Sequence, residues 1–303
     1  LLQNFDIEKY NYKLELLQKQ SVGLSHQSYN IDGHQWALAL DAATQVSCYR
    51  NDLITSLPKS WDDLLQLSQN NKVIWPLKPV HAISSFFSIY NNITEVFEPN
   101  NKNFIQTDFG VKTLQMMKLI SQYLPSECFG MDPIKTAEIL SEQNEFFYSP
   151  YTYGFSNYSR TGYRKNLLTY GDVIDLSGKG PRGTHLGGTG IAISNKSKNT
   201  ELALEYSFWI AGSECQQTIF YTSGGQPGNS DAWENNNINF ETNNFFKNTR
   251  LTLDQAWVRP RHNGYMKFQD ESGNIINEYL QSNVSEVDVI DKLKLIYAES
   301  FEK

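Results

Sequence analysis

Residues 30–50, Asn-Ile-Asp-Gly-His-Gln-Trp-Ala-Leu-Ala-Leu-Asp-Ala-Ala-Thr-Gln-Val-Ser-Cys-Tyr-Arg, decide the fold of this chain. The run 36–40 is apolar throughout, which is typical of a strand covered on both faces. It stops at Asp41, and a second apolar run, 46–49, begins after two alanines and two polar residues. A strand that stops at an acid and resumes after a short joint predicts a hinge between two lobes. Polar groups at such a joint would face a cleft, where small ligands bind.

Asp41 interrupts an apolar run, which makes it the carboxylate most expected to have a function. A lone carboxylate suits binding, because its oxygens can accept hydrogen bonds from two hydroxyl groups of one ligand. The alternative is a structural acid that accepts backbone N–H bonds at the joint. Both interpretations stay open at this stage.

Three blocks of sequence, in order, carry a resemblance to a known family. They are Gly33-His-Gln-Trp-Ala-Leu-Ala-Leu-Asp-Ala-Ala-Thr44 with Tyr49-Arg50 and Pro58-Lys-Ser-Trp61; Gly187-Gly-Thr-Gly-Ile-Ala-Ile-Ser194 with Cys215-Gln216 and Ser223-Gly-Gly-Gln-Pro-Gly228; and Arg259-Pro-Arg261-x-x-Gly264-Tyr265. Together they resemble the family 1 extracellular solute-binding proteins, the binding components of ABC importers, of which the maltose-binding type is the familiar relative. The resemblance covers nearly the whole chain, and no motif in it names a ligand.

The resemblance implies an α/β, two-lobed, type 2 periplasmic-binding fold with hinge crossings near Asp41, Gly188 and Arg259. On this basis 1–41 and 188–256 would form the N-terminal lobe, and 42–187 with 257–303 the C-terminal lobe. The chain starts at Leu1 without a visible signal peptide, so we expect an N-terminal truncation that removes the first strands of the N-terminal lobe.

The implied function is capture of a small polar solute, a sugar or a sugar derivative, and its delivery to the permease subunits of the transporter. The same resemblance implies a monomer in the periplasm or at the cell surface. It also implies ligand contacts at the lobe crossings, from Thr44, Gln45, Gly187 and Gly188. Tyr151 would bring an aromatic ring to the cleft, and a sugar presents an apolar C–H face to such a ring. Trp233 and Trp257 are weaker candidates for ligand stacking, and for both a place in the core is the better interpretation.

Composition excludes several classes of function. The 303 residues carry a formal net charge of −7, which argues against a nucleic-acid surface, since phosphate binding needs a basic stripe. No apolar run approaches the roughly 20 residues of a membrane-spanning helix. The three cysteines are far apart and the histidines are scattered, so we expect neither a metal site nor another cofactor.

An enzyme is the competing hypothesis. Residues 178–183 match G-x-G-x-x-G on paper, but Pro181 lies inside the match and no helix follows to bind a phosphate. A carbohydrate-active enzyme could use Asp41, but glycoside cleavage needs a second placed carboxylate, and the sequence indicates none. We therefore predict no catalysis.

Local signals predict several helices. Residues 8–20 have a weak helical pattern, and Ser60 to Asp63 fits a capping box. Asp132-Pro133 fits an N-cap followed by proline at the first helical position. Residues 285–288 fit a second capping box before a closing helix. The spacing of Leu202, Tyr206, Trp209 and Ile210 predicts a helix whose apolar face, made by these residues, points inward.

Overall fold

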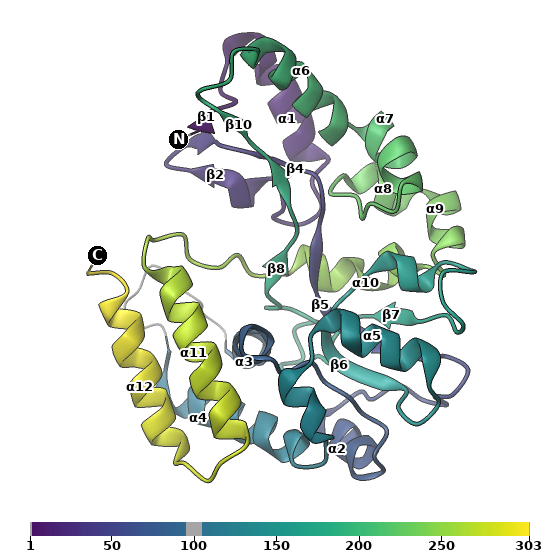
Figure 1. The fold of residues 1–303 in the computed structure, drawn as a ribbon, viewed down its shortest axis with the longest axis vertical. Helices are drawn as coiled ribbons and strands as arrows, with labels where there is room; N and C mark the ends of the chain where they lie inside the picture. The colour runs from purple at the N-terminus through teal and green to yellow at the C-terminus, as the bar shows by residue number, and fades with distance from the viewer. Residues whose placement is uncertain (1, 95–104, 303) are drawn as a thin grey trace.

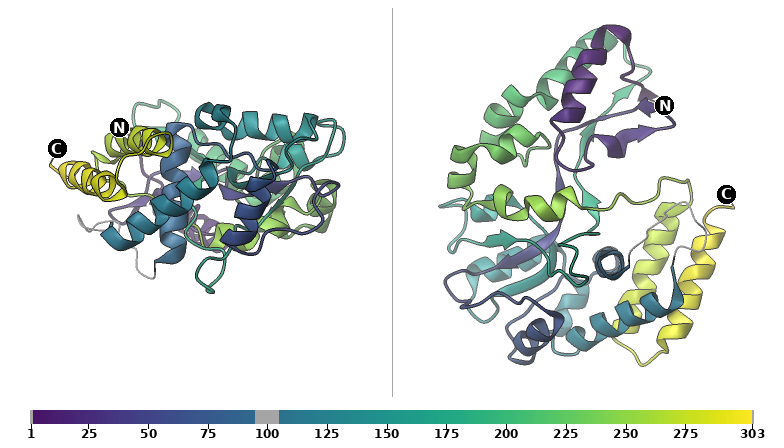
Figure 2. Two further views of the ribbon diagram at one scale, coloured as in Figure 1. Left: turned by 90° about the horizontal axis from the view of Figure 1, so that it is seen from below. Right: turned by 180° about the vertical axis from the view of Figure 1, so that it is seen from behind.

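The computed structural model of the protein describes residues 2–94 and 105–302. It consists of two lobes that are joined by strands running from one into the other (Figure 1). The view from behind shows the same division, with the N-terminus in one lobe and the C-terminus in the other (Figure 2). The two-lobed fold with hinge crossings that the sequence predicts is confirmed.

The upper lobe in Figure 1 is built from two separate parts of the chain. Its elements are β1 (Leu2–Gln3), α1 (Asn11–Lys19), β2 (Asn30–Ile31), β3 (His34–Gln35), β4 (Leu38–Ala39), β9 (Gly190–Ile191), β10 (Ile193–Ser194), α6 (Thr200–Ala211) and α7 (Ser213–Cys215), which a π-helical turn (Gln216–Phe220) extends. β1 pairs with β10, and β4 pairs with β9, both antiparallel. Strands far apart in the sequence therefore hold this lobe together.

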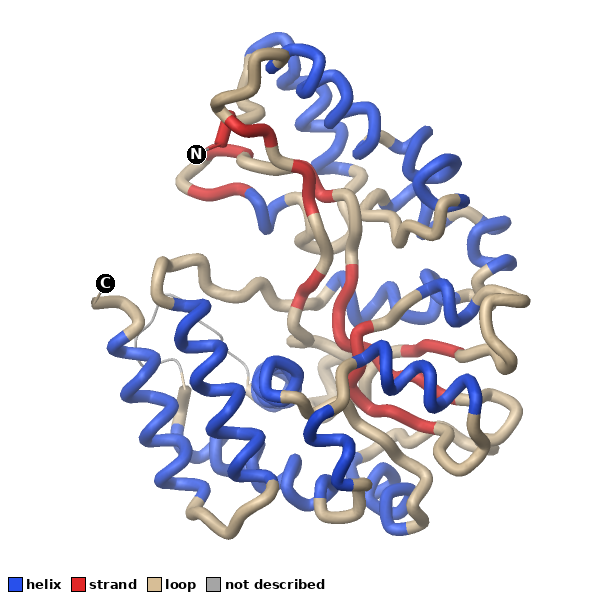
Figure 3. The backbone as a smooth tube through the Cα atoms, in the orientation of Figure 1, coloured by secondary structure: helices blue, strands red, loops and turns tan. Residues whose placement is uncertain are grey.

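The lower lobe has a central sheet with helices on both faces. Its strands are β5 (Ala43–Tyr49), β6 (Tyr148–Tyr153), β7 (Thr169–Gly171) and β8 (Leu186–Gly187), and its helices are α2 (Trp61–Gln69), α3 (Pro79–Ile93), α4 (Thr107–Ser121), α5 (Pro133–Glu142), α10 (Phe245–Asp254), α11 (Tyr265–Leu280) and α12 (Glu286–Glu299). The short helices α8 (Ser230–Glu234) and α9 (Asn236–Glu241) connect α7 to α10. β5 is the organising strand, because β6, β7 and β8 all pair with it (Figure 3).

The larger hydrophobic core surrounds α3. Eleven consecutive residues of this helix, 82–92, are buried, as expected of a helix covered on all sides. α11 and α4 pack against it, and Tyr148 and Tyr151 reach the same core from β6. A second core covers the other face of the sheet, where Val46 and Tyr170 meet α5 and α10.

α10 differs from the predicted division of the chain, which placed 188–256 in the upper lobe. Phe245 and Phe246 of α10 belong to the same buried cluster as Val46 and Tyr170 of the lower sheet, and the rings of Tyr170 and Phe245 are 5.1 Å apart. The aromatic pair at the start of α10 covers the sheet, so this helix packs as part of the lower lobe. The remaining boundaries stay predictions.

Most of the predicted helix starts are present. Ser60 and Asp63 form the reciprocal capping box of α2, and the Asp132 side chain caps α5. α12 begins at Glu286 as expected, but Ser285 makes no side-chain cap bond, so the predicted capping box there is wrong.

The predicted inner face of α6 is also wrong. Leu202, Tyr206 and Trp209 are 67%, 49% and 46% exposed, whereas Leu204 and Phe208 of the same helix are buried. α6 is apolar on more than one side, and its second stripe is the one that packs on the upper-lobe core.

Candidate functional site

Two strands continue from one lobe into the other and form the hinge. β4 leads into β5 through residues 40–42, and β8 leads into β9 through residues 188–189. The backbone N–H groups of Leu40 and Asp41 both donate to the Thr189 carbonyl, at 2.9 and 3.1 Å. The pairing of β5 with β8 below and of β4 with β9 above makes a narrow two-stranded ladder through the joint.

Gly188 is required by this geometry. Its φ is +107°, and a Cβ added there would lie 2.2 Å from the carbonyl oxygen of Asp41. Only glycine adopts this conformation without strain and allows the two crossing strands to approach so closely. Gly188 therefore serves the crossing through its backbone, at the point where β8 leads into β9.

Asp41 lies at the point where the upper strand enters the joint. It is partly buried, and among the described residues no group makes a hydrogen bond to its carboxylate, whereas its backbone is bridged to Pro227. Burial raises the pKa of Asp41 to about 6. The structural alternative required the carboxylate to accept backbone N–H bonds, and it accepts none in the described part of the chain. A carboxylate in this state is available to a ligand.

Two arginines of the third crossing lie near Tyr29. The guanidinium of Arg261 lies 6.0 Å from the centre of the Tyr29 ring, which belongs to the upper lobe. Burial raises the pKa of Tyr29, with Arg261 and Arg259 opposing the shift and Asp41 adding to it. Tyr29 therefore lies within the electrostatic reach of one acid and two cations.

Tyr153, at the end of β6, completes this group from the lower lobe. Its hydroxyl donates to the His185 carbonyl at 3.3 Å, and burial raises its pKa to about 12, against the effect of Arg259. A Cβ at Gly187 would lie 2.7 Å from the Tyr153 ring, so Gly187 makes room for that ring. We call Tyr29, Asp41, Tyr153, Arg259 and Arg261 the hinge site.

Two neutral histidines lie behind Tyr153. The ring of His81 is 6.2 Å from that of Tyr153, and Ser84 Oγ is 3.0 Å from His185 Nδ1. Ser84 Oγ also lies within hydrogen-bond distance of the Val80 carbonyl, at 2.8 Å. Burial lowers the pKa of His81 to about 4 and, together with Arg259 and Arg261, that of His185 to about 3. Neither ring adds charge near neutral pH.

Four residues that the sequence placed at the site lie inside the protein. Gln45 is fully buried between Ser85 and Ser88, donating to one hydroxyl and accepting from the other. Thr44 is buried, and its hydroxyl bonds the His185 carbonyl. These two positions hold the hinge strand against α3 and the 183–186 segment, and they present no polar group to a ligand.

The two aromatic candidates are buried as well. Tyr151 is fully buried and stacks on Trp75, because the strand turns this position toward the core around α3. Trp233 is 3% exposed, and its indole N–H donates to the Pro227 carbonyl at 2.6 Å. Trp257 packs in the core as expected. In β6 it is Tyr153, two residues after Tyr151, that reaches the hinge.

The glycine-rich loop does not form a phosphate site. The carboxylate of Asp175 accepts hydrogen bonds from the backbone N–H groups of Ser177, Gly178 and Gly180. The donors that would bind a phosphate are thus already satisfied by an acid of the loop itself.

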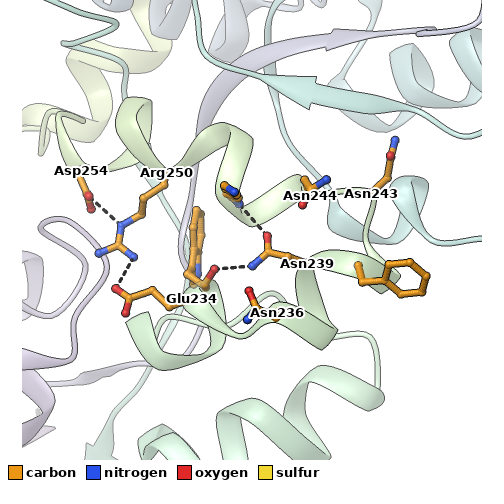
Figure 4. A pocket seen from close by; sticks show the side chains of 10 residues that line it. Glu234, Asn236, Asn239, Asn243, Asn244, Arg250 and Asp254 are labelled. Carbon is orange, nitrogen blue, oxygen red and sulfur yellow. Dashed lines mark hydrogen bonds and ion pairs between the residues drawn. The ribbon is translucent and has the colours of Figure 1, made fainter.

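A hollow of about 720 Å³ lies away from the hinge, between α8, α9 and α10 (Figure 4). The asparagine-rich segment that the sequence indicates as a surface excursion forms part of its wall. Arg250 is held there by Asp254 and Glu234, and Asn239 donates to the Trp233 carbonyl. These polar groups are occupied with one another.

Residues 2–94 and 105–302 contain no cluster of three or more His, Cys, Asp or Glu side chains arranged to hold a metal ion. In the same part of the chain no helix combines the length and the apolar character needed to cross a membrane.

Comparison with known proteins places the fold. No family model matches the chain. A curated relative, the arabinooligosaccharide-binding protein of Bacillus subtilis (strain 168), is 24% identical over 242 residues, which is 69% of this chain and 52% of the relative. The chain thus spans about half the length of that relative.

Solved structures agree over nearly the whole chain. Maltose-bound MalE3 of T. maritima aligns with a TM-score of 0.81 at 16% identity, covering 98% of this chain and 79% of the other. A ribitol complex of an ABC transporter solute-binding protein from Agrobacterium radiobacter K84 aligns with a TM-score of 0.79 at 18% identity, covering 97% and 78%. The chain therefore has the two-lobed fold of the maltose-binding and related solute-binding proteins of ABC transporters.

Proposed function

We propose that this chain is the solute-binding component of an ABC importer. It captures a small polar solute, a sugar or a sugar derivative, between its lobes and delivers it to the permease subunits. The observation that carries this proposal is the carboxylate of Asp41, which is partly buried beside the crossing strands and has no hydrogen-bond partner among the described residues. A carboxylate that no described residue engages can accept hydrogen bonds from a ligand, and ligand hydroxyl groups would supply the donors.

The relatives support this class of ligand. The neighbouring structures hold maltose, ribitol and, in a protein from Thermotoga lettingae, tagatose, and the curated relative binds arabinooligosaccharides. All of these are polyhydroxyl compounds. In this chain Asp41 would accept hydroxyl hydrogen bonds, and the Tyr153 ring would offer an apolar face to the C–H groups of a sugar.

We further propose that the chain is not an enzyme. The raised pKa of Asp41 would suit a general acid, but glycoside cleavage needs a second carboxylate across the bond. The other described carboxylate whose pKa is raised, Asp172, is bonded to Thr252. The competing hypothesis, a carbohydrate-active enzyme using Asp41, predicts turnover that Asp41→Ala abolishes.

Calorimetric titration of the full-length protein with mono- and oligosaccharides tests the proposal. Asp41→Asn should weaken the affinity for the best ligand by roughly 1.5–3 kcal/mol, because the carboxylate would accept hydrogen bonds from it. Asp172→Asn is the matched control, since Asp172 is bonded within the lower lobe. An affinity that Asp41→Asn leaves unchanged would show that Asp41 does not bind the ligand. The absence of binding to any polyhydroxyl solute would refute the proposed function.

The remaining expectations follow from the same proposal. The protein would work at the cell surface or in the periplasm as a monomer, with no cofactor and no nucleic-acid partner. Its macromolecular partners would be the permease subunits of the transporter.

A further inference from the structure

The third crossing presents two arginines to the hinge site. Arg259 and Arg261 flank Pro260 in the irregular segment between α10 and α11. Pro260 is buried while its two neighbours are more accessible. Both arginines lie within electrostatic reach of Tyr29 and of His185, and the guanidinium of Arg261 lies 6.0 Å from the centre of the Tyr29 ring in the upper lobe. Both therefore contribute their charge to the same part of the hinge site.

Neither arginine has a carboxylate partner within ion-pair distance in the described part of the chain. Arg259 donates to the neutral Gln269 side chain at 2.9 Å. Arg261 makes no hydrogen bond to any described residue, and the group it contacts is the face of Tyr29.

Three other arginines of the chain are neutralised by acids, and Arg160 and Arg182 donate to backbone carbonyl groups. Arg50, Arg164 and Arg250 each pair with a carboxylate, at 2.6, 2.6 and 2.7 Å. The arginines at the hinge thus carry the unmatched positive charge of this surface, and they lie close enough for Arg259 to disfavour the charged form of Arg261.

Two unmatched guanidinium groups side by side are the arrangement that recognises an anionic oxygen group, because each can donate two parallel hydrogen bonds to it. The carboxylate of Asp41, in the same hinge site, can accept hydrogen bonds from hydroxyl groups. A ligand that binds both the carboxylate and the arginines carries hydroxyl groups at one end and an anionic group at the other.

We infer that the solute is an acidic saccharide, whose hydroxyl groups bind Asp41 and whose anionic group binds Arg259 and Arg261. This inference rests on the proposed function and narrows its substrate class. A carboxylate, as in a uronic acid, and a phosphate, as in a sugar phosphate, share this chemistry. Both groups accept paired hydrogen bonds from a guanidinium, but a phosphate carries nearly two negative charges at neutral pH. The site combines two arginines with one acid, Asp41, so a singly charged carboxylate matches its charge better, and a uronic acid is the member we expect.

Calorimetry on the full-length protein with matched pairs tests the inference. The probes are glucose, galactose and mannose, their di- and trisaccharides, the corresponding uronic acids, and glucose 6-phosphate. We expect the best uronic acid to bind at least tenfold tighter than its neutral counterpart and tighter than the sugar phosphate. Raising the salt concentration should reduce that preference.

Variants separate charge recognition from folding. Arg261→Gln should weaken binding of the uronic acid at least tenfold more than it weakens binding of the neutral sugar, whereas Arg261→Lys should keep part of the preference. Arg160→Gln is the control, because Arg160 lies over Tyr221 and bonds its carbonyl. It should change neither affinity.

The outcomes distinguish the preference for an acidic saccharide from the solute-binding function itself. A neutral sugar that binds as tightly as its acid, or an equal loss for both in Arg261→Gln, would overturn the acidic saccharide and leave the solute-binding function standing. Tighter binding of glucose 6-phosphate than of any uronic acid would show that the arginines recognise a phosphate and not a carboxylate, and the inference of an anionic ligand would stand. No binding of any member would refute the proposed function itself.

Discussion

Replacing Asp41 by asparagine should make the ligand-free protein more stable above about pH 6. The folded protein holds the pKa of Asp41 at about 6, against 3.8 for an unperturbed aspartate, because burial penalises the ionised form. A raised folded-state pKa means that the folded protein binds the proton more tightly than the unfolded chain does. The stabilisation by this proton is complete below about pH 4 and is lost as the pH rises through 6.

The size of the effect follows from the pKa difference. Each pKa unit is worth about 1.4 kcal/mol, so the shift of Asp41 from 3.8 to about 6 corresponds to about 3 kcal/mol. Above pH 7 the ionised carboxylate costs the folded state up to this amount. The asparagine side chain has the same shape as aspartate and cannot ionise, so the Asp41→Asn variant should gain up to about 3 kcal/mol there and little below pH 4.

Urea denaturation of both proteins between pH 4 and pH 8, without ligand, measures this difference directly. Comparing the two proteins at each pH cancels the titration of all other groups. Asp270→Asn, at an exposed position on α11, is the control and should show no such pH-dependent gain. A stability difference between wild type and Asp41→Asn that is the same at every pH would refute the reasoning, because it would mean that the carboxylate is as well solvated in the folded protein as in the unfolded chain.

Two further predictions concern the geometry of the hinge. Gly188→Ala should destabilise the protein by about 2 kcal/mol or more, because it adds a clash with the Asp41 carbonyl to the strain of a positive φ. Gly33→Ala, at a positive φ with open space around it, should cost less stability. Equal losses of stability in urea denaturation would show that the clash at Gly188 contributes nothing. Tyr151→Phe should leave ligand affinity unchanged and stability unchanged or higher, because the Tyr151 hydroxyl has no partner among the described residues. Tyr153→Ala, which removes the ring proposed to face the sugar, should weaken binding, and a comparable loss of affinity in Tyr151→Phe would show that Tyr151 reaches the ligand.

The sequence predicts the joint well because it is encoded locally. An acid at the end of an apolar run, followed by small residues, marks the point where β4 leads into β5. Likewise Ser60 and Asp132 act within one turn of their helices, so their effect can be read without the tertiary structure.

The composition of the hinge site is harder to predict, because it depends on how far along a strand a side chain lies. Tyr151 and Tyr153 both meet groups on the α3 side of the sheet, Trp75 and His81 respectively. Tyr153 is the last residue of β6, and it therefore lies at the hinge while Tyr151 lies in the core. Tyr29 and the role of Arg261 carry no local signal at all, since they meet only across the lobes.

Helix α6 illustrates a second limit. Spacing of three and four residues is compatible with either of two stripes when a helix is apolar on several sides. The partner decides: Phe5, Leu38 and Ile193 of the upper lobe pack against the stripe with Leu204 and Phe208. Those partners come from parts of the chain that periodicity does not connect.

The pairing of the first strand with the tenth has a consequence for how the protein is made. Leu2 pairs with Ser194, so the first strand cannot find its neighbour until the ribosome has added almost two hundred further residues. At roughly 5–20 residues per second this delay is about 10 to 40 seconds. During that time β5 can already pair with β6 and with β7, whose strands lie earlier in the chain than β10. Residues 190–194 therefore provide the partner on which the first strand can pair. A nascent chain stalled shortly before residue 190 should leave residues 2–40 more open to protease than the completed chain does.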